Sequence, residues 1–145
     1  MAARDRIALM LAALWWGGIT ALSFAAVPLL FARLGSPAVA GPVAAQLFSL
    51  QCWAGIVIGA ALLALLKQGA APEPRRFATL GIVCFALLLA LVQEFGVAPR
   101  IVSARASGGN LPLWHGIGSA LVLAQWVCSG AVLWRLSRAA PDQPA

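Results

Sequence analysis

Four long apolar runs constrain this chain more than any other feature. They cover residues 7–31, 43–66, 77–98 and 113–134, and each holds about 22 to 25 residues, enough for a helix to cross a hydrocarbon core of about 30 Å. Lipid cannot hydrogen-bond to backbone groups, and the runs lack the alternation of barrel strands. The sequence therefore predicts an all-α integral membrane protein, with four transmembrane helices in an antiparallel up-down bundle over residues 1–138.

The ends of the chain carry less information. The first run resembles a secretion signal, but about 25 apolar residues exceed the apolar region of about 7–15 residues in a signal peptide. We therefore expect this run to remain as a helix of the mature protein. Residues 139–145, rich in Pro and Ala, are predicted to form a disordered tail.

Composition excludes an ordinary soluble domain. Hydrophobic residues make up 62% of the chain and charged residues only 10%, against about 45–50% and 25% in soluble domains. Ten Lys and Arg against four Asp and Glu give a net charge of +6, which can indicate nucleic-acid binding. Here the basic residues flank the apolar runs, a pattern typical of membrane topology. We expect contact with a lipid bilayer and no nucleic-acid partner.

The basic residues also predict orientation. Arg33, Arg100 and Arg105 fall on one side of the predicted bundle, and the other seven Lys and Arg fall on the opposite side. Basic loops are retained in the cytoplasm. We therefore expect a multi-pass protein of the inner (cytoplasmic) membrane with both termini in the cytoplasm.

Small residues at four-residue spacing predict which helix faces approach one another in lipid. The stripes consist of Ala13, Gly17, Ala21 and Ala25; Gly55 and Gly59; Ala86, Ala90, Glu94 and Ala98; and Gly116, Ala120, Ala124 and Cys128. The third stripe includes the only acidic residue inside an apolar run, so we expect Glu94 to point into the bundle. Cys52, Cys84 and Cys128 lie in different runs and are interpreted as small core residues.

A faint internal repeat is also present. Phe24-x-x-x-Pro28 near the end of the first run recurs as Phe95-x-x-x-Pro99 in the third, and a glutamine stands at a similar position in the second and fourth runs. We expect each proline to close its helix. Either the chain contains two repeated helical hairpins, related by an axis along the membrane normal, or the match is a coincidence of residues common in membrane helices.

Polar residues concentrate in the predicted outer half and define a candidate pocket. Its members are Glu94, Arg100, His115, Ser119, Gln51 and Arg33. A carboxylate about 7–8 Å from the end of a membrane helix is costly unless it is paired or protonated. Arg33, Arg100, Arg105 and His115 are the candidate partners of Glu94, and a partner on another helix is favoured. The acid is either a proton or cation site or a structural tie between helix ends.

His115, the only histidine, opens the predicted fourth helix, with Ser119 one turn below it. It is a hydrogen-bonding end residue, a proton acceptor for Glu94, or a haem or copper ligand. A bundle cytochrome normally needs two axial ligands, and Met10 is expected at the opposite end. We predict no cofactor, with haem or copper on His115 as a weak alternative. The sequence shows no hydrolase triad or phosphate-binding loop, so we do not expect an enzyme.

An ordered set of short motifs resembles a known family. The motifs are Leu14-Trp15-Trp16-Gly17-Gly18, Phe24-x-x-x-Pro28-Leu29-Leu30-Phe31, Ala40-Gly41, Ala98-Pro99-Arg100 and His115-Gly116. In order and spacing they are similar to the bacterial membrane domain of unknown function related to transmembrane protein 205. This resemblance implies a four-helix membrane domain without an established activity. It is also distantly similar to CopD-type copper-resistance domains and to a haem-dependent oxidase whose first-helix histidine this chain lacks.

Three classes of function stay open at this point. The first is a membrane protein with an outward-facing polar pocket for a proton, cation or small ligand. The second is a haem- or copper-linked membrane redox protein. The third is a structural or accessory subunit, for which small residues on several helices would supply contacts in a homo-oligomer or a membrane complex.

Overall fold

Four long helices build the molecule. The computed structural model describes residues 2–68 and 73–138, and its four apolar helices are each long enough to cross a membrane: Ala3–Leu34, Pro37–Lys67, Pro74–Ser107 and Leu111–Ser137. We call these the first to fourth spans. The predicted fold class is confirmed, and the described residues contain no strand. The predicted tail, residues 139–145, lies outside the described residues.

The first and third spans are each divided by a short π-helical segment. The first consists of α1 (Ala3–Ala21), η1 (Leu22–Ala26) and α2 (Val27–Leu34), and the third consists of α4 (Glu73–Leu91), η2 (Val92–Val97) and α5 (Ala98–Ser107). The second span is α3 (Pro37–Lys67) and the fourth is α6 (Leu111–Ser137).

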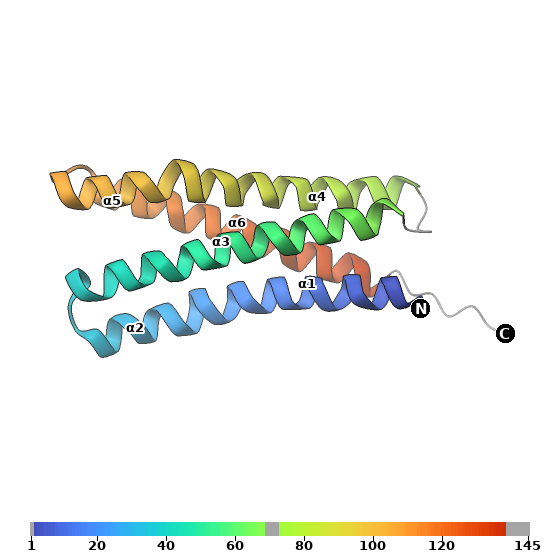
Figure 1. Ribbon diagram of the computed structural model, residues 1–145, viewed down its shortest axis with the longest axis horizontal. Helices are drawn as coiled ribbons and strands as arrows, with labels where there is room; N and C mark the ends of the chain where they lie inside the picture. The colour runs from blue at the N-terminus through green and yellow to red at the C-terminus, as the bar shows by residue number, and fades with distance from the viewer. Residues whose placement is uncertain (1, 69–72, 139–145) are drawn as a thin grey trace.

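The spans form a closed antiparallel bundle. Each span packs against the next one in sequence, and α6 packs back against α1. The start of α1 and the end of α6 lie at one end, which we call the terminal end; the opposite end, with the α2–α3 and α5–α6 connections, is the α2/α5 end (Figure 1). The helices diverge toward the α2/α5 end (Figure 1).

The helices continue past prolines that were expected to end them. Pro28 and Pro99 lie inside the first and third spans, each two residues after the end of a π-helical segment. In these segments the Val27 N–H donates to the Leu22 carbonyl and the Ala98 N–H donates to the Gln93 carbonyl, five residues back. The wider turn moves backbone carbonyls away from the proline ring, which in an α-helix would strike the carbonyl four residues back.

The actual helix ends carry capping residues instead. Gly35 and Gly108 adopt the left-handed conformation, with φ of 62° and 76°, which suits glycine at a helix C-terminus. Ser36 and Asn110 then accept backbone N–H bonds at the start of α3 and α6. The connections are therefore shorter than the gaps between the apolar runs, residues 32–42 and 99–112, and the spans extend about 40 to 51 Å at 1.5 Å per residue.

The terminal half of the bundle is tightly packed. A Cβ atom on Gly59 would lie 2.5 Å from Leu87 Cδ2, and one on Gly55 would lie 2.9 Å from Trp15 Nε1. The buried cluster also includes small residues such as Ala12 and Ala86. Close helix contact through small residues, as predicted for the second and third spans, therefore closes this half.

The predicted small-residue stripes of the first and fourth spans are wrong. Ala13, Ala21 and Ala25 are exposed, and so are Gly116 and Ala120. The buried faces consist of Ala8, Ala12, Trp15 and Ile19 in α1, and of Gly118, Val122, Gln125, Ser129 and Val132 in α6. Larger side chains occupy these interfaces because glycines on the neighbouring helices make room for Trp15 and Trp16.

The two hairpins repeat each other in their aromatic contacts. Phe24 of η1 packs edge-on against Trp126 of α6, with ring centroids 5.6 Å apart. Phe95 of η2 packs edge-on against Trp53 of α3, with ring centroids 6.1 Å apart. A rotation that exchanges the first span with the third and the second with the fourth relates these contacts, as it relates the two π-helical segments. This arrangement agrees with two repeated helical hairpins.

Candidate functional site

A cavity of about 530 Å³ lies between all four spans in the half toward the α2/α5 end. Most of its wall is apolar, formed by side chains such as Phe31, Phe48, Ile101 and Val122. It reaches within about two turns of the helix ends, at Phe31, Gly41, Arg105 and His115. The deepest lining residue of each span is Ser23, Cys52, Gln93 or Trp126, and we call these four the floor. Below the floor, the packed terminal half closes the bundle.

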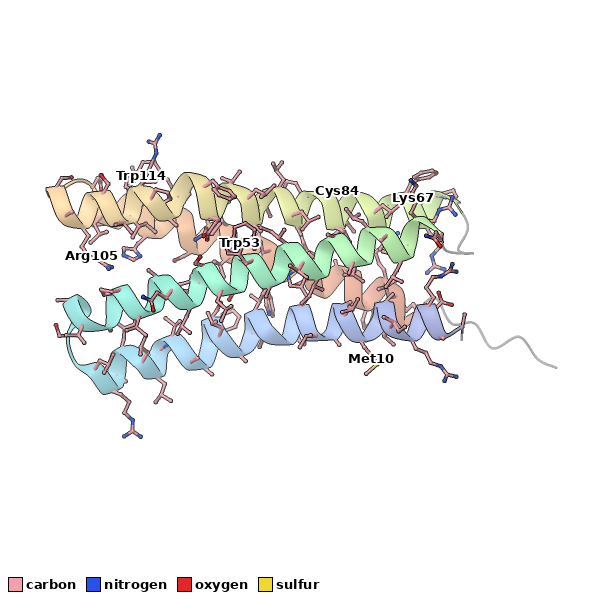
Figure 2. All side chains as sticks on the ribbon, in the orientation of Figure 1. Met10, Trp53, Lys67, Cys84, Arg105 and Trp114 are labelled. Carbon is pink, nitrogen blue, oxygen red and sulfur yellow. The ribbon has the colours of Figure 1, made fainter. Side chains whose placement is uncertain are left out.

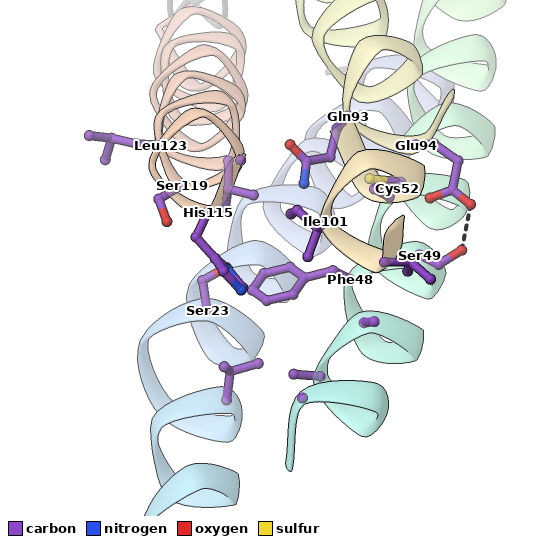
Figure 3. A pocket seen from close by; sticks show the side chains of 18 of the residues that line it. Ser23, Phe48, Ser49, Cys52, Gln93, Glu94, Ile101, His115, Ser119 and Leu123 are labelled. Atoms are coloured by element: carbon purple, nitrogen blue, oxygen red, sulfur yellow. Dashed lines mark hydrogen bonds between the residues drawn. The ribbon is translucent and has the colours of Figure 1, made fainter. Parts of the chain in front are cut away.

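The π-helical segment η2 places two neighbouring polar residues at the cavity. Gln93 is buried, with 6% of its surface exposed, and Glu94 is partly buried. Ser49 of α3 donates a hydrogen bond of 2.6 Å from Oγ to Glu94 Oε1 (Figure 3). Within the described residues, Gln93 Oε1 has no hydrogen-bond partner. The segment therefore presents one satisfied carboxylate oxygen and one unsatisfied amide oxygen.

Each span also contributes one polar side chain near the middle of the bundle. These residues are Thr20, Gln51, Gln93 and Gln125, each about 21 Å from the α2/α5 end of its own helix. Trp126 Nε1 donates to Thr20 Oγ1 at 2.9 Å, and Ser23 Oγ donates to Gln51 Oε1 at 3.4 Å. Within the described part of the chain, the Nε2 atoms of Gln51 and Gln125 are buried without a partner. Such unsatisfied groups are costly in a membrane interior.

Three of the predicted pocket residues line the cavity. Glu94, His115 and Ser119 do so from the third and fourth spans, and Figure 3 shows them on opposite sides of the cavity. Gln51 is buried beside the floor and bonds to Ser23, but it is not a lining residue.

The predicted arginines behave differently. Arg33 is exposed near the end of α2 and Arg100 follows Pro99 in α5; neither lines the cavity. The Arg100 guanidinium lies 4.8 Å from the centre of the Trp114 ring on α6. Among residues 2–68 and 73–138, no basic group forms an ion pair with Glu94. The expected ion pair is replaced by the Ser49 hydroxyl, because the π-turn directs Glu94 toward α3.

Sequence reasoning missed three residues of the site. Ser49 stands two positions before Gln51, and Gln93 immediately precedes Glu94, so both were within reach of the polarity pattern. Arg105 was considered only as a partner for Glu94. Its guanidinium instead extends from α5 toward α3 (Figure 2), where a Cβ on Gly41 would lie 2.5 Å from its NH1 atom. Gly41 therefore makes room for Arg105 at the mouth of the cavity.

The geometry gives no support to a metal centre on His115. Within the described ranges, no three His, Cys, Asp or Glu residues cluster closely enough to hold an ion. Met10 is exposed on α1 toward the terminal end (Figure 2), whereas His115 lies near the α2/α5 end. The two residues cannot act as ligands of one haem iron in a single chain.

Comparison with known families assigns the chain. The family described as a domain of unknown function, DUF4149, matches residues 10–110. The chain belongs to this family. The DUF4149 match covers the second and third spans completely and the first span from Met10 onward, and it ends immediately before α6. The cavity wall formed by α6, with His115 and Ser119, therefore lies outside the matched part. No curated protein and no solved structure is significantly similar to the chain.

Proposed function

We propose that this membrane protein binds a small, largely apolar molecule in the cavity between its four spans. The observation that carries the proposal is an apolar cavity of about 530 Å³ with a few polar groups at its floor and mouth. Ligand pockets typically measure about 300–1,000 Å³ and combine apolar walls with a few polar groups. Membership of the DUF4149 family assigns no activity, so the proposal rests on this geometry.

The ligand enters from the α2/α5 end. The opposite half is closed by the packed cluster that includes Trp15, Leu62 and Val132. Lys and Arg are concentrated at the terminal end, which the topology rule assigns to the cytoplasm. In this proposal the protein lies in the inner membrane with both termini in the cytoplasm, and the cavity opens outward.

The finer likeness to transmembrane protein 205 and to CopD-type domains stays a prediction. Nothing in the described part of the chain favours the haem- or copper-linked alternative over ligand binding. The accessory-subunit alternative likewise stays a prediction.

Photolabelling with a neutral apolar probe tests the proposal. The purified protein in detergent is irradiated with 3-trifluoromethyl-3-phenyldiazirine, and the labelled residues are mapped by mass spectrometry. We expect saturable labelling of Phe48 or Ile101, which line the cavity. Lipid-facing Leu88, which is 55% exposed, should be labelled without saturation.

Two glycine-to-leucine substitutions in α6 serve as the test variant and its control. A Cβ on Gly118 makes ordinary contacts at 3.5 Å with Gln93 and Ile101, so Gly118→Leu places its remaining carbons in the cavity. Gly116 lies two residues away, has no atom within 4 Å of its Cβ position and does not line the cavity. Gly118→Leu should abolish the saturable labelling and Gly116→Leu should preserve it. Unsaturable labelling in the wild-type protein, or equal loss in both variants, would refute the proposal.

A further inference from the structure

We infer that the molecule bound in the cavity is a lipophilic cation, an amine or onium group on an apolar body, with Glu94 as its counter-charge. The inference rests on the proposed function and names the chemical class of its ligand. Three features of the site carry it: the carboxylate without an ion pair among the described residues, the unpaired amide oxygen of the preceding residue, and the aromatic rings that line the same cavity.

Among the described residues, the inner part of the cavity carries one acidic group and no basic group. The acidic group is Glu94, and Ser49 supplies it with a hydrogen bond but no positive charge. No ion pair to Glu94 exists within the described residues. A carboxylate in a membrane interior is costly without a counter-charge. A cation in the cavity would supply that charge, and a neutral or anionic ligand would not.

Gln93 strengthens the same preference. Its side chain is more than nine-tenths buried, and its Oε1 atom lacks a hydrogen-bond partner among the residues described. Gln93 and Glu94 come from one π-helical segment, and both line the cavity. An amide oxygen left unpaired in a low-dielectric site favours an N–H donor or a positive charge nearby.

Aromatic rings complete the recognition of a cation. Phe24, Phe48 and Trp126 all line the cavity, and they come from three different spans. The face of an aromatic ring attracts a cation, by about 0.5–1 kcal/mol at exposed sites and more where water is excluded. A cavity lined by aromatic rings and one carboxylate suits an ammonium or onium group better than a carbonyl or a phosphate.

The mouth of the cavity offers the competing interpretation. Arg105 and His115 lie there, and they would favour an anionic head group with its tail in the cavity. Arg105 is exposed, so water and salt screen its charge. It also lies about 16 Å along the helix from Glu94. The buried inner part of the cavity therefore favours a cation over an anion. The binding test below includes an anionic probe as the competing result.

Two probes of the same shape and opposite charge test the inference. Binding of radiolabelled tetraphenylphosphonium and of radiolabelled tetraphenylborate to the full-length protein in detergent is measured by equilibrium dialysis, each ion in a separate sample because the two precipitate together. We expect saturable binding of the cation and no saturable binding of the anion. Glu94→Gln should weaken cation binding about tenfold or more, whereas Glu94→Asp should restore it to within about threefold of wild type. Arg105→Gln should tighten cation binding slightly, because it removes a positive charge from the mouth of the cavity.

The outcomes separate this inference from the proposed function. Equal binding by the wild-type protein and Glu94→Gln, or preferential binding of tetraphenylborate that Arg105→Gln abolishes, would overturn the cation assignment. If the neutral diazirine labels the cavity but tetraphenylphosphonium does not bind, the ligand class is wrong and ligand binding stands. If neither probe binds to correctly folded protein, both are wrong. Far-UV circular dichroism and thermal unfolding of each variant establish that the protein is folded.

Discussion

Replacing Ser49 with alanine removes the hydroxyl that donates to Glu94 and leaves the carboxylate without its partner. The oxygen–oxygen distance of 2.6 Å falls in the range of about 2.5–2.7 Å for hydrogen bonds to charged oxygens. Net contributions of such bonds are about 1.5–3 kcal/mol in soluble proteins. Bonds between membrane helices average about 0.6 kcal/mol and reach about 1.7 kcal/mol. Because this bond is short and partly buried, we expect a coupling energy of about 1 to 1.7 kcal/mol.

A double-mutant cycle measures this coupling. The free energy of unfolding is determined for wild type, Ser49→Ala, Glu94→Met and the double variant, by far-UV circular dichroism in mixed detergent and dodecyl sulfate micelles. Methionine matches the length of glutamate without its charge. The control cycle uses Ser119→Ala in place of Ser49→Ala. Ser119 lines the same cavity from α6 and, among the described residues, has no hydrogen bond to Glu94. Its coupling energy should be close to zero.

Additive effects at Ser49 and Glu94 would refute the reasoning. Independent sites add within about 0.3–0.5 kcal/mol, so a smaller coupling means that the hydroxyl is not the partner of the acid. A third cycle combines Glu94→Met with Arg100→Gln. A larger coupling in that cycle would indicate that Glu94 pairs with Arg100, one of the partners that the sequence predicted. The structure instead places the Arg100 guanidinium over Trp114.

Two further predictions concern packing and access. Gly59→Ala should lower the free energy of unfolding by about 1–2 kcal/mol, because the new Cβ would lie 2.5 Å from Leu87 Cδ2 and the side chain must move. Gly81→Ala, with no atom within 4 Å of its Cβ position, should be neutral or stabilising by up to about 1 kcal/mol; equal effects would contradict the packing. In a background with serine at the three native cysteines, a membrane-impermeant cationic methanethiosulfonate added to spheroplasts should modify Ser119→Cys about tenfold faster than the neighbouring Ala120→Cys, which faces away from the cavity. Similar rates at both positions would exclude an outward-open cavity.

The four spans and the inward direction of Glu94 could be predicted from the sequence. Apolar length and the requirement to satisfy every backbone group inside the segment are local properties, so no tertiary information was needed. The stripe of Ala86 and Ala90 correctly placed Glu94 toward the interior, because both alanines are fully buried. The corresponding stripes of the first and fourth spans pointed outward, since Trp15 and Trp16 pack where neighbouring glycines leave space.

The helix ends show a different kind of limit. Proline is a correct signal of strain in an α-helix, and sequence reasoning therefore stopped the helices near Pro28 and Pro99. One extra residue in each preceding turn relieves the strain, and packing against the neighbouring helices keeps the longer helix folded. The capping residues Ser36 and Asn110 were visible in the sequence and would have placed the next helix starts correctly.

The sequence by itself determined that a polar site lies in one half of a four-helix membrane bundle, since polar residues in long apolar runs are few and their depth follows from counting residues. Only the tertiary structure decided that Glu94 meets Ser49 instead of an arginine, and that Gln93 lines the cavity while its Oε1 atom stays buried without a partner among the described residues. These contacts depend on the rotation that the π-helical segment η2 gives to its side chains and on where the helices diverge. Both arise from contacts between spans far apart in the chain, which local pattern and composition do not contain.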